Sequence, residues 1–148
     1  MKYEFLNSKE KKKIIEFLKT RFGYSGKDDF HLIKENDEIF LFSSDLDNVD
    51  INKLKVRQIG MKIGTYNGDM LILTIQGTQY FGPKCHKHII NLSDLDARHY
   101  LKGEDIDFEE PDGVYLIKND DNLLGCSKIY NGIVRNNIED SRQINCKD

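Results

Sequence analysis

The stretch Gly113–Gly132, GVYLIKNDDNLLGCSKIYNG, decides how the second half of the chain folds. Its two apolar runs, Val114–Ile117 and Leu123–Ile129, are short and rich in residues that favour strands. Between them lies Asn119–Asn122, whose Asn and Asp side chains bond the backbone nearby and tolerate positive φ. The pattern predicts a β-hairpin with a four- or five-residue loop. Gly125 predicts a bulge or a place where another backbone comes close.

The residues around this hairpin predict further short elements. Lys87–Asn91 has the composition of a strand, and Ser93 is suited to cap a short helix over Asp94–Leu101. Glu104–Asp112 is strongly acidic and is expected to be a loop. After the hairpin, Gly132–Asn136 is expected to add one more strand.

The first half of the chain opens with a predicted helix over Asn7–Phe22. Asn7 followed by Glu10 has the spacing of a capping box, and Gly23 marks the helix end. Lys9–Lys13 contains four lysines, a run typical of the solvated face of an amphipathic helix. The apolar residues near helical spacing are Ile14, Ile15, Phe17, Leu18 and Phe22.

Two further hairpins are predicted after this helix. Turn residues separate Phe30–Lys34 from Glu38–Ser43, and both runs are rich in strand formers. Val56–Tyr66 and Asp69–Thr74 flank Asn67-Gly68, a dipeptide that favours tight hairpin turns because both residues accept positive φ.

A domain boundary is expected near Pro83. Ser44–Leu54 has apolar residues at roughly helical intervals and is interpreted as a short helix, and Ile75–Tyr80 is interpreted as a short helix or loop. Pro83 follows Gly82 and interrupts regular structure. The predicted fold class is α+β, with an α+β domain over residues 1–83 and a second, β-rich domain over residues 84–148.

Composition is that of a soluble globular protein, with 39% hydrophobic and 32% charged residues. The net charge of −3 excludes a globally basic nucleic-acid binder, so any RNA contact needs a local patch. Cys85, Cys126 and Cys146 form no C-x-x-C pair, which fits a reducing compartment. The N-terminal residues lack the apolar core of a signal peptide, and the apolar runs are too short to span a bilayer. We therefore expect a cytoplasmic protein without membrane contact.

The order of several motifs resembles a known family. Gly60–Gly64 leads into a strand, Tyr100–Gly103 ends a helix, Gly113 opens a strand, and Leu124-Gly125 follows the polar turn. This order resembles the ribosome-biogenesis factors of the Nip-seven family, archaeal type, and related proteins with a PUA domain. The resemblance implies a small α/β N-terminal domain and a C-terminal PUA-like β-barrel. It also implies RNA binding in RNA processing, rRNA processing, RNA modification or ribosome biogenesis. The implied partners are RNA (rRNA or tRNA) and an RNA-modifying enzyme or ribosome-assembly factor docked on the N-terminal domain.

The expected RNA surface is a local cluster of cations. From Lys84 onward there are nine Lys and Arg residues against thirteen Asp and Glu residues, but the cations lie mainly in the flanks. A closed barrel can bring its first and last strands together, and Lys and Arg gathered there would contact phosphates. The candidate RNA-binding residues are Lys84, Lys87, His88, Lys128, Arg135 and Arg142. The candidates for base stacking are Tyr80, Phe81, Tyr100 and Tyr130.

Other functions have less support in the sequence. No G-x-G-x-x-G, P-loop or G-x-S-x-G motif is present, so no enzyme activity and no cofactor are expected. Cys85, His86 and His88 are potential zinc ligands, but neighbouring residues of a strand point to opposite faces, so no metal site is expected. The alternatives are an adaptor that has lost RNA affinity, an accessory domain of a methyltransferase or pseudouridine-forming complex, and a small metal-dependent hydrolase built on these three residues.

Overall fold

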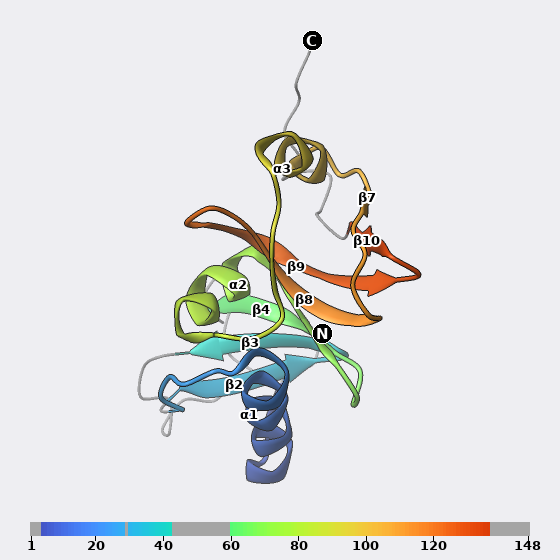
Figure 1. Ribbon diagram of the computed structural model, residues 1–148. Coiled ribbons are helices and arrows are strands. Elements are labelled where there is room, and N and C mark those ends of the chain that lie inside the picture. Colours follow the sequence, from blue (N-terminus) through green and yellow to red (C-terminus); the bar gives the residue numbers. More distant parts are fainter. Residues whose placement is uncertain (1–3, 29, 43–59, 137–148) are drawn as a thin grey trace.

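The structure is a computed structural model that describes residues 4–28, 30–42 and 60–136. These residues form two five-stranded sheets with three α-helices (Figure 1). The helices are α1 (Ser8–Phe22), α2 (Ile75–Phe81) and α3 (Asp94–Leu101), and a 3₁₀ turn, η3, spans Gly82–Lys84. The combination of helices with two largely antiparallel sheets confirms the predicted α+β class.

The first sheet is antiparallel and keeps the order of the sequence. Its strands are β1 (Glu4–Phe5), β2 (His31–Glu35), β3 (Glu38–Phe42), β4 (Met61–Tyr66) and β5 (Leu71–Leu73). The turn between β2 and β3 follows the local signal, whereas the turn between β4 and β5 lies one residue later than predicted, because Tyr66 pairs with Leu71 and the Asn67 N–H donates to the Met70 carbonyl. Asn36 adopts a φ of 54° between β2 and β3, and the Asn67 side chain accepts hydrogen bonds from the backbone N–H groups of Asp69 and Met70. The helix predicted over Ser44–Leu54 lies outside the described residues.

Helix α1 has the predicted ends. The Asn7 side chain accepts a hydrogen bond from the Glu10 backbone N–H at 2.8 Å, and the Glu10 carboxylate accepts one from the Asn7 N–H at 3.3 Å. Gly23 ends the helix with a φ of 65°, a conformation that favours glycine. Ile14, Leu18 and Phe22 are fully buried, so the apolar stripe packs into the core.

The second sheet is curled and mixed. Its strands are β6 (Ile89–Asn91), β7 (Ile106–Asp107), β8 (Gly113–Asn119), β9 (Asn122–Tyr130) and β10 (Ile133–Arg135). They lie in the order β6-β8-β9-β10-β7, with β6 parallel to β8 and the other pairs antiparallel. The prediction of a loop throughout the acidic segment is wrong in part. Ile106 pairs with Val134 of β10, and both side chains are buried.

The hairpin β8–β9 is present, but its turn is shorter than predicted. Asn119 pairs with Asn122, so only Asp120 and Asp121 remain in the turn, and Asp120 adopts a φ of 52°. The Asn119 amide also donates to the Leu92 carbonyl at 2.9 Å. The register shifts beside Gly125, as a bulge requires.

The close neighbour of Gly125 is a side chain and not a backbone segment. A Cβ at this position would lie 2.8 Å from the hydroxyl of Tyr100. That hydroxyl is itself buried and lies 2.7 Å from the hydroxyl of Ser127 on the same strand as Gly125. Gly125 thus makes room for a buried tyrosine from α3.

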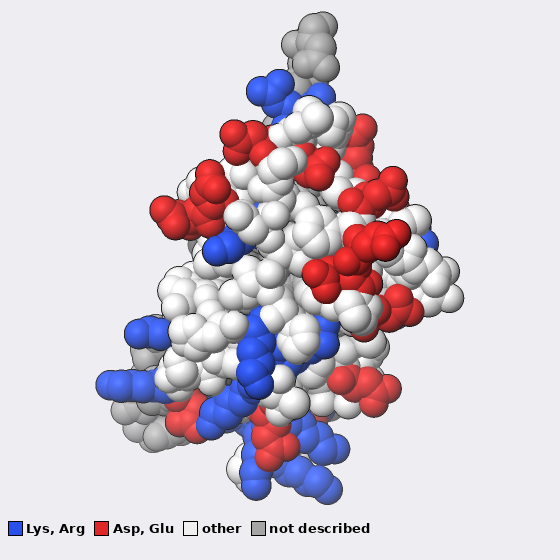
Figure 2. Space-filling view, viewed as in Figure 1, with Lys and Arg blue, Asp and Glu red and all other residues white. Residues whose placement is uncertain are grey.

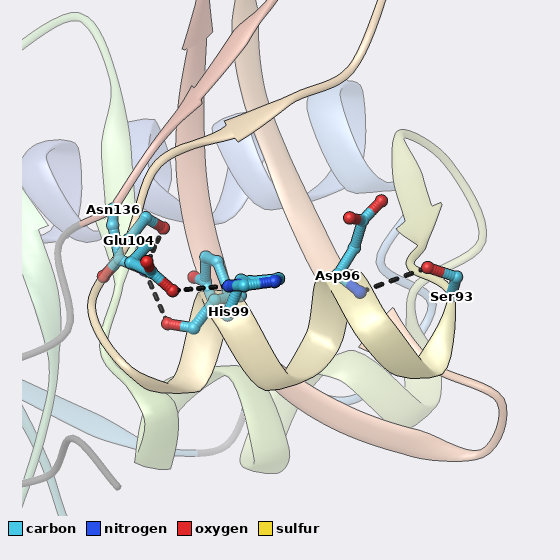
Figure 3. A network of polar contacts seen from close by, with 6 residues as sticks. Ser93, Asp96, His99, Glu104 and Asn136 are labelled. Atoms are coloured by element: carbon cyan, nitrogen blue, oxygen red, sulfur yellow. Dashed lines mark hydrogen bonds and ion pairs between the residues drawn. The ribbon is translucent and has the colours of Figure 1, made fainter. Parts of the chain in front are cut away.

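Both ends of α3 are held by polar contacts (Figure 3). The Ser93 side chain accepts a hydrogen bond from the Asp96 N–H at 3.1 Å, as predicted for its cap. At the other end, His99 Nδ1 lies 2.6 Å from a Glu104 carboxylate oxygen. The Asn136 amide donates to the backbone carbonyls of Tyr100 and Glu104, so the chain after β10 is fastened to the end of α3.

The two sheets share a hydrophobic core. One cluster combines Leu18 and Phe22 of α1 with Val114 and Leu116 of β8 and with Cys126 of β9. A second cluster lies between α3 and the opposite face of the second sheet. Helix α2 packs against both β4 and β9. The two predicted domains thus pack against each other through this core. The domain boundary at residue 83 stays a prediction.

Candidate nucleic-acid interface

The predicted RNA-binding residues are placed in two groups. Lys84 ends η3, and Lys87 and His88 directly precede β6 at one edge of the second sheet. Lys128 and Arg135 lie on β9 and β10, with β8 and β9 between β6 and β10. The prediction that the opening and closing strands lie side by side is therefore wrong. Strand β6 pairs in parallel with β8 and forms one edge of the sheet, whereas β10 lies between β9 and β7.

Lys128 and Arg135 are close to each other on neighbouring strands. They are cross-strand partners and so share one face of the sheet. The Arg135 guanidinium lies 3.6 Å from an Asp105 carboxylate oxygen and 6.0 Å from the centre of the Tyr130 ring. Arg135 is thus partly neutralised by a nearby acid. Arg142 lies outside the described residues.

Lys87 and His88 lie where helix α1 meets the second sheet. The backbone N–H of Lys87 donates to the Phe22 carbonyl at 2.9 Å, and His88 Nδ1 contacts the Arg21 carbonyl. Arg21 Nε donates to the Val114 carbonyl at 2.6 Å, and its guanidinium lies over the Tyr115 ring at 4.6 Å. These interactions fix the end of α1 against the start of β8.

Burial divides the four candidate stacking residues. Phe81 and Tyr100 are fully buried, so neither can stack on a base, and that prediction is wrong for both. Phe81 is in ring contact with Phe30 in the core. Tyr80 and Tyr130 are 43% and 48% exposed and remain available for stacking.

Cations and acids are separated on the molecular surface (Figure 2). In this view Lys and Arg gather over the half that holds α1 and the first sheet, and Asp and Glu gather over the half that holds α3 and β7. From residue 88 to residue 136 the chain has ten acidic and five basic residues. The acids are Asp94, Asp96, Glu104, Asp105, Asp107, Glu109, Glu110, Asp112, Asp120 and Asp121.

The exposed lysines of α1 are not among the predicted site residues, because a lysine run on an amphipathic helix is typical of an ordinary solvated face. Lys9, Lys12, Lys13 and Lys19 are exposed, and within the described part of the chain none of them makes an ion pair. The signal in the sequence is the Lys9–Lys13 run, and the structure places the C-terminal end of the same helix beside Lys87.

Cys85, His86 and His88 have three different surroundings. Cys85 is buried, its Sγ lies 3.3 Å from the Phe81 carbonyl oxygen, and desolvation raises the pKa of its thiol to about 11. His86 is exposed and contacts the Ser25 hydroxyl, whereas His88 contacts Arg21. Among the described residues no group of three His, Cys, Asp or Glu side chains is arranged to hold a metal ion.

The helices in the described residues are all too short or too polar to cross a bilayer. No curated protein matches the chain. Residues 87–142 match the family model described as the PUA domain of the methyltransferase RsmF. The second sheet with α3 is thus similar to a PUA domain, a kind of domain that binds RNA and that occurs as an accessory domain of RNA methyltransferases.

Proposed function

We propose that this chain is a non-catalytic RNA-binding protein of RNA processing or ribosome biogenesis. It binds RNA through the PUA-like domain, and the N-terminal domain docks a protein partner. The observation that carries the proposal is the match of residues 87–142 to the RsmF PUA domain. The Nip-seven-like relationship and a cytoplasmic location belong to the same proposal and rest on the sequence pattern.

The edge of the second sheet before β6 favours phosphate binding. Lys84 and Lys87 are exposed, and in the described residues neither makes an ion pair. Their backbones are held by hydrogen bonds with Ser25 and Phe22, so the two ammonium groups extend from a fixed turn. Lys128 and Arg135 offer a second, weaker group of cations because Asp105 lies beside Arg135.

A salt titration tests this function. Binding of a fluorescent single-stranded RNA is measured by anisotropy between about 50 and 300 mM salt, and log K should fall linearly with log salt. Lys84→Ala with Lys87→Ala should weaken binding and lower the slope by about 1.4, which is about 0.7 for each phosphate that is no longer neutralised. Lys128→Ala with Arg135→Ala should have a smaller effect. Absence of binding by the unmodified protein at about 50 mM salt would refute the proposal.

The acidic surface of α3, β7 and the segment before β8 favours a second candidate function. An adaptor that binds a basic protein partner through this surface would explain why the PUA-like half is more acidic than the rest. An accessory subunit of an RNA-modifying enzyme combines both roles. The adaptor is favoured if the salt titration shows no RNA binding while Glu109→Gln with Glu110→Gln weakens capture of a lysine-rich peptide.

A further inference from the structure

We propose that the exposed face of α1 is a second phosphate-binding surface, which holds the backbone of RNA that the PUA-like domain engages. This inference rests on the proposed RNA binding and specifies where the backbone runs. The surface consists of Lys9, Lys12, Lys13 and Lys19 and is called the α1 lysine face below. None of the residues expected from the sequence to bind RNA lies on it.

The periodicity of α1 gathers these lysines on one side. Residues three and four positions apart share a helix face, so Lys12 and Lys13 are each neighbours of Lys9, and Lys19, seven positions after Lys12, continues the Lys12 side further along the helix. The opposite side carries Ile14, Leu18 and other core residues. Glu16 is the acid on the exposed side and offsets one of the four positive charges.

A hollow beside α1 offers space for a phosphate and its sugar. It has a volume of about 360 Å³ and is lined partly by Lys11, Lys12 and Lys19. Lys11 is already held there, because its ammonium donates to the Asp28 carbonyl at 2.9 Å and lies 5.2 Å from the Phe30 ring centre. The acids Glu16 and Asp28 also line the hollow, so its three lysines exceed its acids by one positive charge.

The α1 lysine face is continuous with the edge of the PUA-like sheet. A Cβ built on Gly23, the residue that ends α1, would lie 3.1 Å from Cγ of Lys87. The Ser25 N–H donates to the Lys84 carbonyl at 2.9 Å, which places η3 beside the same turn. With fifteen residues at about 1.5 Å rise, α1 extends the basic surface by about 22 Å. A bound strand can therefore pass from Lys87 along the helix.

The distribution of charge favours this path over one across the second sheet. The carboxylates near β7 repel phosphates, whereas the surface around α1 attracts them (Figure 2). A basic amphipathic helix can also bind a membrane, but then its apolar face enters the lipid. In α1 that face is occupied, because Ile14, Leu18 and Phe22 are fully buried in the core. RNA is therefore the partner that fits.

The test compares two double variants with the same change in net charge. Lys12→Gln with Lys13→Gln removes charge from the α1 lysine face, and Arg98→Gln with Lys118→Gln removes it from the acidic half. Anisotropy with a single-stranded RNA of about 20 nucleotides should show a salt slope lower by about 1.4 for the first variant and binding roughly 10- to 30-fold weaker at about 0.1 M salt. The control should stay close to the unmodified protein, and Lys12→Arg with Lys13→Arg should retain binding.

The outcomes separate this inference from the proposed function. If the unmodified protein binds RNA and Lys12→Gln with Lys13→Gln leaves its slope unchanged, the α1 path is refuted and RNA binding stands. If the unmodified protein binds no RNA, both proposals fall. Binding to vesicles of phosphatidylcholine with about 30% phosphatidylserine, abolished in the α1 variant, would in that case assign the lysines to a membrane surface. Circular dichroism of each variant checks that α1 is intact.

Discussion

A methyl group added at Gly77 should destabilise the protein, because the backbone of β4 leaves no room for it. Gly77 lies in α2, the helix that packs against both β4 and β9 and so joins the two sheets. A Cβ at this position would lie 2.1 Å from the Ile63 carbonyl oxygen and 2.9 Å from its carbon. These are backbone atoms of a paired strand and cannot move aside as a side chain does. Gly77→Ala therefore forces α2 away from β4.

The size of the effect follows from two opposing contributions. Overpacking in a core costs about 1–3 kcal/mol, and a clash with backbone belongs at the upper end. Replacing glycine by alanine inside a helix stabilises the helix by about 1 kcal/mol. The expected net loss is about 2 kcal/mol, or about 4–8 °C in Tm for a chain of this size.

Urea and thermal unfolding followed by circular dichroism measure this loss. Gln76→Ala is the matched control, because Gln76 is the preceding residue of α2 and is exposed, and its change should stay within about 0.5 kcal/mol. A Gly77→Ala protein as stable as the unmodified one would show that α2 does not approach β4 as closely as the structure has it.

Three further predictions concern buried and paired groups. The hydrogen bond between Glu10 and Lys34 lowers the pKa of Glu10 and raises that of Lys34. The pair therefore stabilises the fold at intermediate pH, and this stabilisation is lost as the pH falls below about 4.5 or rises above about 10.5. Glu10→Gln should keep the helix cap and make both losses smaller, by less than ~1 kcal/mol each. Unfolding measured as a function of pH checks this. Cys85 and Cys126 are buried, and desolvation raises their thiol pKa values to about 11 and about 12, so peptide mapping should find both unalkylated by iodoacetamide at a pH of about 8 until the protein unfolds. Tyr100→Phe should cost about 1–2 kcal/mol in urea unfolding, because the hydrogen bond between the buried hydroxyls of Tyr100 and Ser127 is lost; a stability equal to that of the unmodified protein would contradict the buried hydrogen bond.

Local elements follow from the sequence alone. The ends of α1 and α3 are predicted correctly, because a cap is a set of hydrogen bonds among residues three or four positions apart. The hairpin of β4 and β5 is also predicted, but its turn lies one residue later than expected, because Tyr66 pairs with Leu71 and the Asn67 N–H donates to the Met70 carbonyl. The hairpin β8–β9 is likewise predicted from local residues. Its predicted turn is too long, because Asn119 and Asn122 pair with each other as strand residues although both residue types favour turns.

The order of the strands and the shape of the charged surface come from tertiary contacts. The parallel pairing of β6 with β8 and the addition of β7 beside β10 separate Lys87 from Arg135, and no local pattern encodes either pairing. The same holds for the aromatics, since Tyr80 and Phe81 are adjacent in sequence but one is exposed and the other buried. Strand order and burial depend on contacts between distant residues, and the free energy of those contacts is set by the whole core. For that reason the lysines of α1 become a candidate RNA surface only once the helix is seen beside the PUA-like sheet.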